Sequence, residues 1–134
     1  MIVQRDFLLP PFDVAFLDAS CWQWETLSIG AANWLLIHQF AVPPGYNHAL
    51  VTVALRIEAG YPDAQIDMAY FWPLLSRTDQ KPIGAADSKE DIAGKSYQRW
   101  SRHRTVANPW RAGIDDVSTH LALVDHWLER EFAR

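Results

Sequence analysis

The stretch Val51-Thr-Val-Ala-Leu-Arg-Ile-Glu58, with the turn Gly60-Tyr-Pro-Asp63 behind it, decides the fold of this chain. Apolar side chains stand at every second position, as one face of a β-strand requires. That face consists of Val51, Val53, Leu55 and Ile57. The Gly-Tyr-Pro-Asp turn ends the strand, because glycine and proline interrupt regular backbone. The pattern predicts a strand that lays one face on a core.

Three further strands are predicted around this one. A period of two begins at Trp22, and residues 34–40 form a nearly continuous apolar run, typical of a strand buried on both faces. Alternation returns over residues 66–72. Because strands that follow one another along the chain usually pair with their neighbours, we expect a four-stranded antiparallel meander.

Helices are predicted at both ends of the chain. Pro10 and Pro11 suit the start of a helix over 10–19, where a missing N–H donor costs nothing. The apolar spacing of residues 114–132 predicts a C-terminal helix. We expect charges that complement the helix dipole in its end turns. These are Asp115 and Asp116 at the start, and Arg130 and Arg134 at the end.

Between the fourth strand and the last helix, residues 73–113 show no regular period. Irregular segments of this length inside a compact domain are usually functional. The sequence therefore predicts an α+β fold with an N-terminal helix, a four-stranded meander, a long active-site segment and a C-terminal helix.

The composition limits the possible functions. The 134 residues, 49% hydrophobic and 21% charged, suit a single globular domain over 1–134. A net charge of −4 gives no general attraction to nucleic acid or anionic membranes. No apolar run approaches the roughly 18 residues of a membrane span, so we expect a cytoplasmic protein. One cysteine excludes an internal disulfide and a Cys-rich zinc site.

Four short motifs occur in order along this string of elements. They are Pro43-Pro-Gly-Tyr-Asn47, Gly60-Tyr-Pro-Asp-Ala64, Tyr97-Gln-Arg-Trp-Ser-Arg-His103 and Trp110-Arg-Ala-Gly-Ile-Asp-Asp116. Together with the order of the elements, they resemble the ubiquitin-conjugating (UBC-like) fold, and in particular its bacterial branch called prokaryotic UBC family E. The resemblance covers almost the whole chain.

The resemblance implies a transferase that conjugates a ubiquitin-like protein without a cofactor. Its implied partners are the ubiquitin-like protein, a ThiF-type adenylating enzyme that activates it, and often a deconjugating protease. In the wider family, a cysteine shortly before a Trp-x-Pro segment takes the ubiquitin-like C-terminus as a thioester, helped by a His-Pro-Asn triplet. This sequence has neither; Ser101 and Arg102 stand at the corresponding place before Trp110. Thioester chemistry at the usual position is therefore excluded.

Ser101 is the candidate acceptor at that place, and His103 is its candidate base. A serine hydroxyl is a weak nucleophile until a base takes its proton, and imidazole is the usual agent near neutral pH. Asp87 or Asp91 could orient His103 if the segment folds back. Asn108 could donate a hydrogen bond to an oxyanion, although Asn-Pro is also a common turn.

Basic and aromatic side chains surround this position, and under the resemblance they would bind the partner. They are Arg99, Trp100, Arg102, Arg104, Trp110 and Arg111. Two alternatives stay open. The chain could be an inactive UBC-fold adaptor that docks the ubiquitin-like protein or its activating enzyme. In a different class, the basic and aromatic cluster could bind single-stranded nucleic acid by phosphate pairing and base stacking, a partner that the acidic charge does not favour.

Three other residues receive structural interpretations. Cys21 has no basic neighbour in sequence to lower its pKa, so we expect a buried, small hydrophobic side chain. His38 and His120 lie on apolar elements and are expected to be structural. No metal-ligand spacing occurs, so no metal is predicted.

Overall fold

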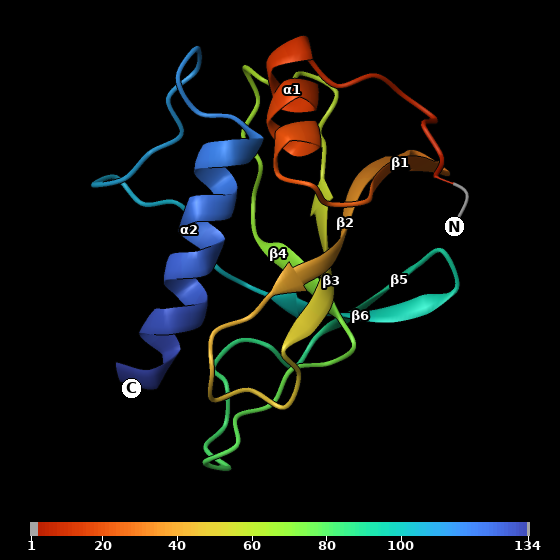
Figure 1. Ribbon diagram of the computed structural model, residues 1–134. Helices are drawn as coiled ribbons and strands as arrows, with labels where there is room; N and C mark the ends of the chain where they lie inside the picture. Colours follow the sequence, from red (N-terminus) through yellow and green to blue (C-terminus); the bar gives the residue numbers. More distant parts are fainter. Residues whose placement is uncertain (1–2, 134) are drawn as a thin grey trace.

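The computed structural model describes residues 3–133 as an antiparallel six-stranded sheet with two α-helices against one face (Figure 1). The elements are α1 (Pro11–Ala19), β1 (Trp24–Ile29), β2 (Ala32–Ala41), β3 (Leu50–Arg56), β4 (Ala69–Trp72), β5 (Lys89–Ile92), β6 (Lys95–Trp100), α2 (Val117–Arg130) and a short 3₁₀ helix, η1 (Glu131–Ala133). The α+β class predicted from the sequence is confirmed.

The N-terminal elements follow the sequence pattern closely. The helix begins at Pro11, and Pro10 is its N-cap residue. The first strand begins at Trp24 rather than Trp22, because Cys21 adopts a left-handed backbone (φ 63°) that delays the extended conformation. The apolar run of β2 is buried from Trp34 to Ile37, as expected of a strand with both faces covered.

The main core lies between the helices and one face of the sheet. Val51, Val53 and Leu55 of β3 are almost completely buried, and they join the same hydrophobic cluster as Leu121 and Val124 of α2. The face predicted from the β3 pattern is therefore confirmed, and it is the surface on which α2 packs.

The sheet has six strands rather than the four predicted, because residues 73–113 contain a β-hairpin. Strands β5 and β6 pair antiparallel and are joined by Ala93 and Gly94, both with positive φ (51° and 83°). A two-residue turn of this kind matches the twist of paired strands. Alanine is an unusual residue at its first position, which is why the sequence pattern did not reveal it. The strand order is β1-β2-β3-β4-β6-β5.

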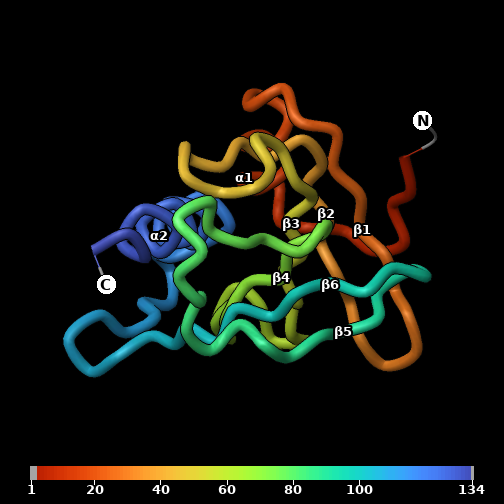
Figure 2. Tube along the Cα trace, turned by 90° about the horizontal axis from the view of Figure 1, so that it is seen from below, coloured from red at the N-terminus to blue at the C-terminus, as the bar shows by residue number. Residues whose placement is uncertain are grey.

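The added hairpin closes a second, smaller core on the other face of the sheet. Ile92 and Tyr97 from the hairpin cluster with Leu27 of β1 and with Trp34 and Leu36 of β2. Residues near the two edges of the sheet therefore meet, so the sheet is curled (Figure 2). This second core explains why both faces of β2 and β3 are apolar.

The start of α2 is tied to α1 and to the Gly-Tyr-Pro turn. The buried Asp13 carboxylate accepts hydrogen bonds from the Tyr61 hydroxyl (2.6 Å) and the Val117 N–H (3.2 Å). Burial raises the pKa of Asp13. The helix starts three residues later than predicted: Asp116 is its N-cap and accepts from the Thr119 N–H, and Asp115 precedes it. The predicted last-turn charge is confirmed for Arg130, whereas Arg134 lies outside the described residues.

Candidate functional site

The candidate site is the segment 101–116, which leaves β6, passes behind α2 in the view of Figure 1 and loops out beside the helix before entering its N-terminus. Ser101 is the first residue after β6 and is half-buried. Its N–H donates to the Ala85 carbonyl (3.0 Å), and the N–H of Arg102 donates to the Trp100 carbonyl (2.9 Å). The second bond closes a three-residue turn centred on Ser101. The backbone around Ser101 is thus held in place from two sides.

His103 forms a dyad with Asp67, which lies just before β4. Its Nδ1 is 3.0 Å and 3.1 Å from the two carboxylate oxygens. Because a carboxylate only accepts, Nδ1 carries the proton, and Nε2 of the neutral ring is then able to accept one. The imidazole side chain is 61% exposed, so Nε2 is accessible to a reacting group.

The orienting carboxylate of His103 is therefore Asp67, and the prediction of Asp87 or Asp91 is wrong. Asp91 lies in β5 opposite Ser96, and Asp87 is exposed just before that strand. Neither carboxylate forms a hydrogen bond with His103 among the described residues, because Asp91 belongs to the β5–β6 hairpin and Asp87 leads into it. Among the residues that the structure describes, no hydrogen bond joins the Ser101 hydroxyl to His103.

Arg102 and Trp100 mainly support the segment. Trp100 is fully buried, so its ring belongs to the main core and is not offered to a partner. The Arg102 guanidinium stacks over that ring (4.9 Å) and binds the buried Glu131 carboxylate (3.0 Å). This arginine therefore attaches the segment to the C-terminal end of α2.

Arg104 holds the other side of the segment. Its side chain is 7% exposed, lies 3.8 Å from the Asp115 carboxylate and stacks over the Trp110 ring (4.8 Å). Trp110 is half-buried, and its indole N–H donates to the Pro62 carbonyl (3.0 Å). The residue most exposed in the predicted cluster is Arg111, whose side chain is 58% exposed and pairs with Asp115.

Arg99 completes the predicted cluster, and it lies within β6, opposite Tyr70 of β4. It is half-buried, so it contributes to the sheet and not to an open basic surface. Taken with the pairing of Arg102 and Arg104, this placement leaves few guanidinium groups of the cluster available for a phosphate chain.

Two adjoining pockets open beside His103, between residues 102–108 and α2. Both are lined by His103, Trp127 and Arg130. One adds Arg102 and Glu131, and the other adds Arg104, Thr105, Asn108, Leu123 and His126. The sequence reasoning did not select the helix residues, although Leu123, Trp127 and Arg130 have the i, i+4, i+7 spacing of one helix face. The resulting surface combines an aromatic wall with cationic groups.

The expected turn at Asn108 is present, because its N–H donates to the Thr105 carbonyl (3.0 Å). Cys21 departs from its prediction: it is exposed rather than buried, in the left-handed position just after α1. Within residues 3–133 no cluster of three or more His, Cys, Asp or Glu side chains is placed to hold a metal ion. In the same range, no helix has the length and apolar character needed to cross a membrane.

His120 is buried beneath the segment, and its surroundings fix its protonation. Its Nε2 donates to the Met68 carbonyl (2.8 Å), and its Nδ1 lies 3.3 Å from the Arg104 guanidinium. Burial lowers the pKa of His120 to about 4, and the positive charge of Arg104 acts in the same direction. The ring is therefore neutral at physiological pH and links α2, the residue before β4 and the segment.

We expect this histidine to make the fold sensitive to acid. Between the usual histidine pKa of 6.5 and the folded value of about 4, the unfolded chain binds a proton that the folded chain does not. The contribution of His120 to the free energy of unfolding is therefore fully present above about pH 6.5 and is lost as the pH falls toward 4. At roughly 1.4 kcal/mol per pKa unit, the loss approaches about 3 kcal/mol.

Urea denaturation from pH 7.5 to 4 measures this effect. His120→Gln keeps a donor for the Met68 carbonyl and should flatten the pH dependence relative to the parent chain. His126 is an exposed histidine on the same helix, so His126→Gln is the matched control and should leave the pH dependence of stability unchanged. Equal pH profiles for the parent and His120→Gln would contradict the assignment.

A sequence model of the family described as Prokaryotic E2 family E matches residues 9–131. No curated protein and no solved structure matches the chain significantly.

Proposed function

Because this chain belongs to prokaryotic E2 family E, and so to proteins with a role in ubiquitin-like conjugation, we propose that Ser101 accepts the activated C-terminus of a ubiquitin-like protein. The supporting observation is the exposed His103–Asp67 dyad, which stands two residues beyond Ser101 with Nε2 accessible. Ser101 occupies the place where the resemblance puts the acceptor.

The proposed step moves the chain from a thioester on a ThiF-type activating enzyme to an oxyester. The Ser101 Oγ attacks the thioester carbonyl carbon while His103 Nε2 takes the hydroxyl proton. The C–S bond then breaks, and the departing thiolate takes the proton to become a thiol. Asp67 holds the imidazole in the required tautomer and stabilises its charged form. Thiolate is the better leaving group, so the transfer runs toward the oxyester.

The pockets beside His103 would hold the incoming C-terminal tail. Trp127 offers an apolar face to both pockets, and Arg130 offers an exposed cationic group beside it. Arg111 lines neither pocket; its exposed guanidinium pairs with Asp115. Asn108 lines one of these pockets, where its amide could donate to the oxyanion. Of the cluster predicted to bind the partner, Arg102 and Arg104 line these pockets and also hold the segment that carries Ser101 and His103. Trp100 is buried, and Arg99 is half-buried in β6.

A second candidate is the adaptor that docks the ubiquitin-like protein or its activating enzyme without chemistry. The specific observation in its favour is that Ser101 and His103 are not hydrogen-bonded to each other among the described residues. Nucleic-acid binding is the least supported reading, because Arg102 and Arg104 are bound to Glu131 and Asp115 within the fold.

The test is reconstitution with the cognate ubiquitin-like protein, its ThiF-type enzyme and ATP. We expect a covalent adduct on Ser101 that survives reducing agent and is cleaved by hydroxylamine or alkali. Ser101→Ala should abolish the adduct, and Ser101→Cys should convert it to a form that reductant removes. Cys21→Ser is the control for the exposed thiol, and this variant should still form the Ser101 adduct.

Mass spectrometry decides between the readings. Mapping of the adduct to Ser101 supports the carrier. Mapping to Cys21 or to a lysine contradicts the Ser101 mechanism. Co-purification with the partners in the absence of any adduct supports the adaptor. Salt-sensitive oligonucleotide binding that weakens in Arg99→Ala/Arg102→Ala would instead favour the nucleic-acid reading.

A further inference from the structure

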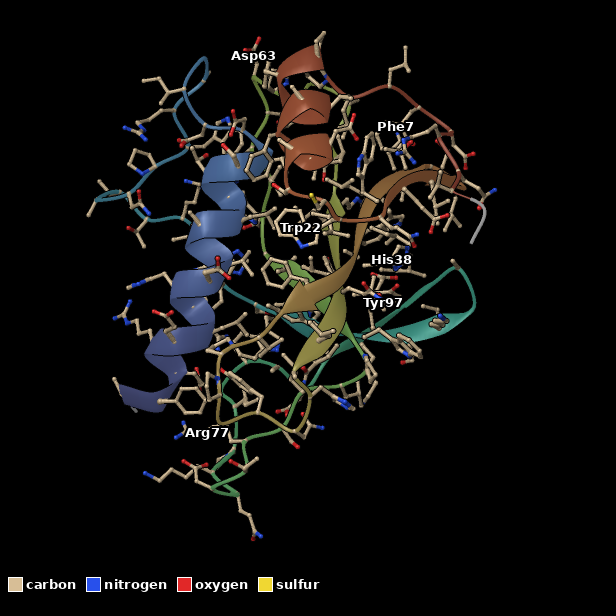
Figure 3. The ribbon with its side chains drawn as sticks, viewed as in Figure 1. Phe7, Trp22, His38, Asp63, Arg77 and Tyr97 are labelled. Atoms are coloured by element: carbon tan, nitrogen blue, oxygen red, sulfur yellow. The ribbon has the colours of Figure 1, made fainter. Side chains whose placement is uncertain are left out.

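Three neighbouring strands, β1, β2 and β3, place a carboxylate, an imidazole and a hydroxyl in a row. None of these groups belongs to segment 101–116. Glu25 of β1 lies 2.7 Å from Nε2 of His38 on β2, and the Nδ1 of that ring lies 3.0 Å from the Thr52 hydroxyl on β3. The Glu25 and His38 side chains are 12% and 17% exposed. Figure 3 shows His38 on the side of the sheet where Tyr97 lies.

For the neutral imidazole, the chemistry of these groups fixes the direction of the hydrogen bonds. The carboxylate only accepts, so Nε2 of His38 carries the proton of the neutral ring. Nδ1 is then the acceptor, and Thr52 donates its hydroxyl proton to it. A hydroxyl that donates to an imidazole oriented by a carboxylate is the arrangement that activates oxygen nucleophiles.

Glu25, His38 and Thr52 are called the relay below, and its His38 and Thr52 side chains face a shallow pocket. His38, Thr52, Leu50, Trp72, Pro73 and Lys95 line it. The apolar side chains can hold a small acyl or aryl group. The Lys95 ammonium lies 4.0 Å from the centre of the Trp72 ring, so a positive charge stands at the same pocket. Such a charge stabilises an oxyanion or an anionic leaving group.

The backbone beside the relay is irregular. The pairing of β2 with β3 shifts between Ile37 and Phe40, and Gln39 within this bulge has a φ of 56°. A left-handed conformation is uncommon for a residue other than glycine. Bulges often lie next to active sites, where they redirect a side chain. The irregularity stands directly after His38 and lines the pocket through Gln39.

We propose that Glu25, His38 and Thr52 form an acyl-transfer site for small activated esters or thioesters. Thr52 Oγ1 attacks the carbonyl carbon, His38 Nδ1 takes the hydroxyl proton, and the bond to the leaving group breaks as that proton passes to it. The product is an acyl ester on Thr52, which water hydrolyses to a carboxylic acid and free Thr52. This activity goes beyond the proposed conjugation, and its pocket shares no residue with the pockets beside His103.

The experiment uses the purified chain and p-nitrophenyl acetate, without any conjugation partner, so that its outcome is independent of Ser101. We expect a burst of p-nitrophenolate close to one equivalent and an acetyl group on Thr52, detected by peptide mass spectrometry and released by hydroxylamine. Thr52→Val keeps the side-chain shape and should abolish the burst. His38→Gln should slow it by roughly 10²–10⁴-fold.

Two further variants keep the outcome interpretable. Thr52→Ser retains a hydroxyl and should retain the burst, even if Thr52→Val folds poorly. Thr78→Val is the matched control, because its hydroxyl donates to the Gly45 carbonyl (3.1 Å) and not to an imidazole. A hydroxylamine-resistant acetyl group on Lys95, acetylation that persists in Thr52→Val, or no acetylation at all would overturn the proposal.

Discussion

Replacing His103 by alanine is expected to slow formation of the Ser101 adduct by roughly 10²–10⁴-fold, the usual contribution of a positioned general base. In the proposed mechanism the imidazole takes the Ser101 proton, and without that base the hydroxyl is a poor nucleophile at neutral pH. Time courses with saturating activating enzyme, quenched and resolved on gels, give the rate. His48→Ala, between β2 and β3, is the matched control and should react at the parental rate.

Asp67 is a positioning residue in this scheme, because it touches His103 and not the reacting atoms. Asp67→Asn removes the charge that fixes the tautomer, so the rate should fall in the same direction, and Asp67→Glu should restore part of it. Thermal unfolding midpoints close to the parental value would exclude a loss caused by misfolding. A His103→Ala variant that forms the adduct at full rate would remove the base from the mechanism.

The regular elements of this fold could be predicted because their patterns are local. The alternation in β3 and the apolar spacing of α2 each follow from which side chains face the core, and both predictions agree with the structure. The β5–β6 hairpin could not be predicted in this way. Its strands are short, and only Ile92, Tyr97, Gln98 and Trp100 are buried along them, so no period emerges from the surrounding polar residues.

The candidate site was predictable only in part, for a related reason. His103 was found from a motif, but its partner Asp67 lies 36 residues away, and the partner of Arg102 lies 29 residues away. A sequence shows arginines and tryptophans side by side, but it does not show whether remote carboxylates pair with them. Trp100 and Arg102 were therefore assigned together to a partner surface, whereas the fold buries Trp100 and pairs Arg102 with Glu131 beside the pocket at His103.

The contacts of His38 could not be predicted from the sequence either. Its place in an apolar strand suggested a structural role, because the residues that contact it come from other strands. Glu25 and Thr52 are 13 and 14 residues away in the chain, and only the register of β1, β2 and β3 brings them together. Side-chain chemistry that depends on the pairing of strands becomes visible only once that pairing is known.

Leu121→Ala is expected to lower the free energy of unfolding by about 2–5 kcal/mol, the usual cost of truncating a buried leucine. Leu121 is 3% exposed and belongs to the cluster that contains Val53 and Leu55 of β3, so its removal leaves a cavity between α2 and the sheet. Urea denaturation at pH 7.5 measures the change.

Leu123→Ala is the matched control, because it makes the same chemical change two residues along the same helix at a half-buried position. Solvent can fill the space left there, so the cost should be clearly smaller. Similar midpoints for the two variants would mean that α2 is not docked on β3 as described. Docking of α2 also positions segment 101–116, since Arg102 binds Glu131 at the C-terminal end of the helix and Arg104 lies beside His120 within it. A helix that is loosened by Leu121→Ala is therefore also expected to weaken formation of the Ser101 adduct.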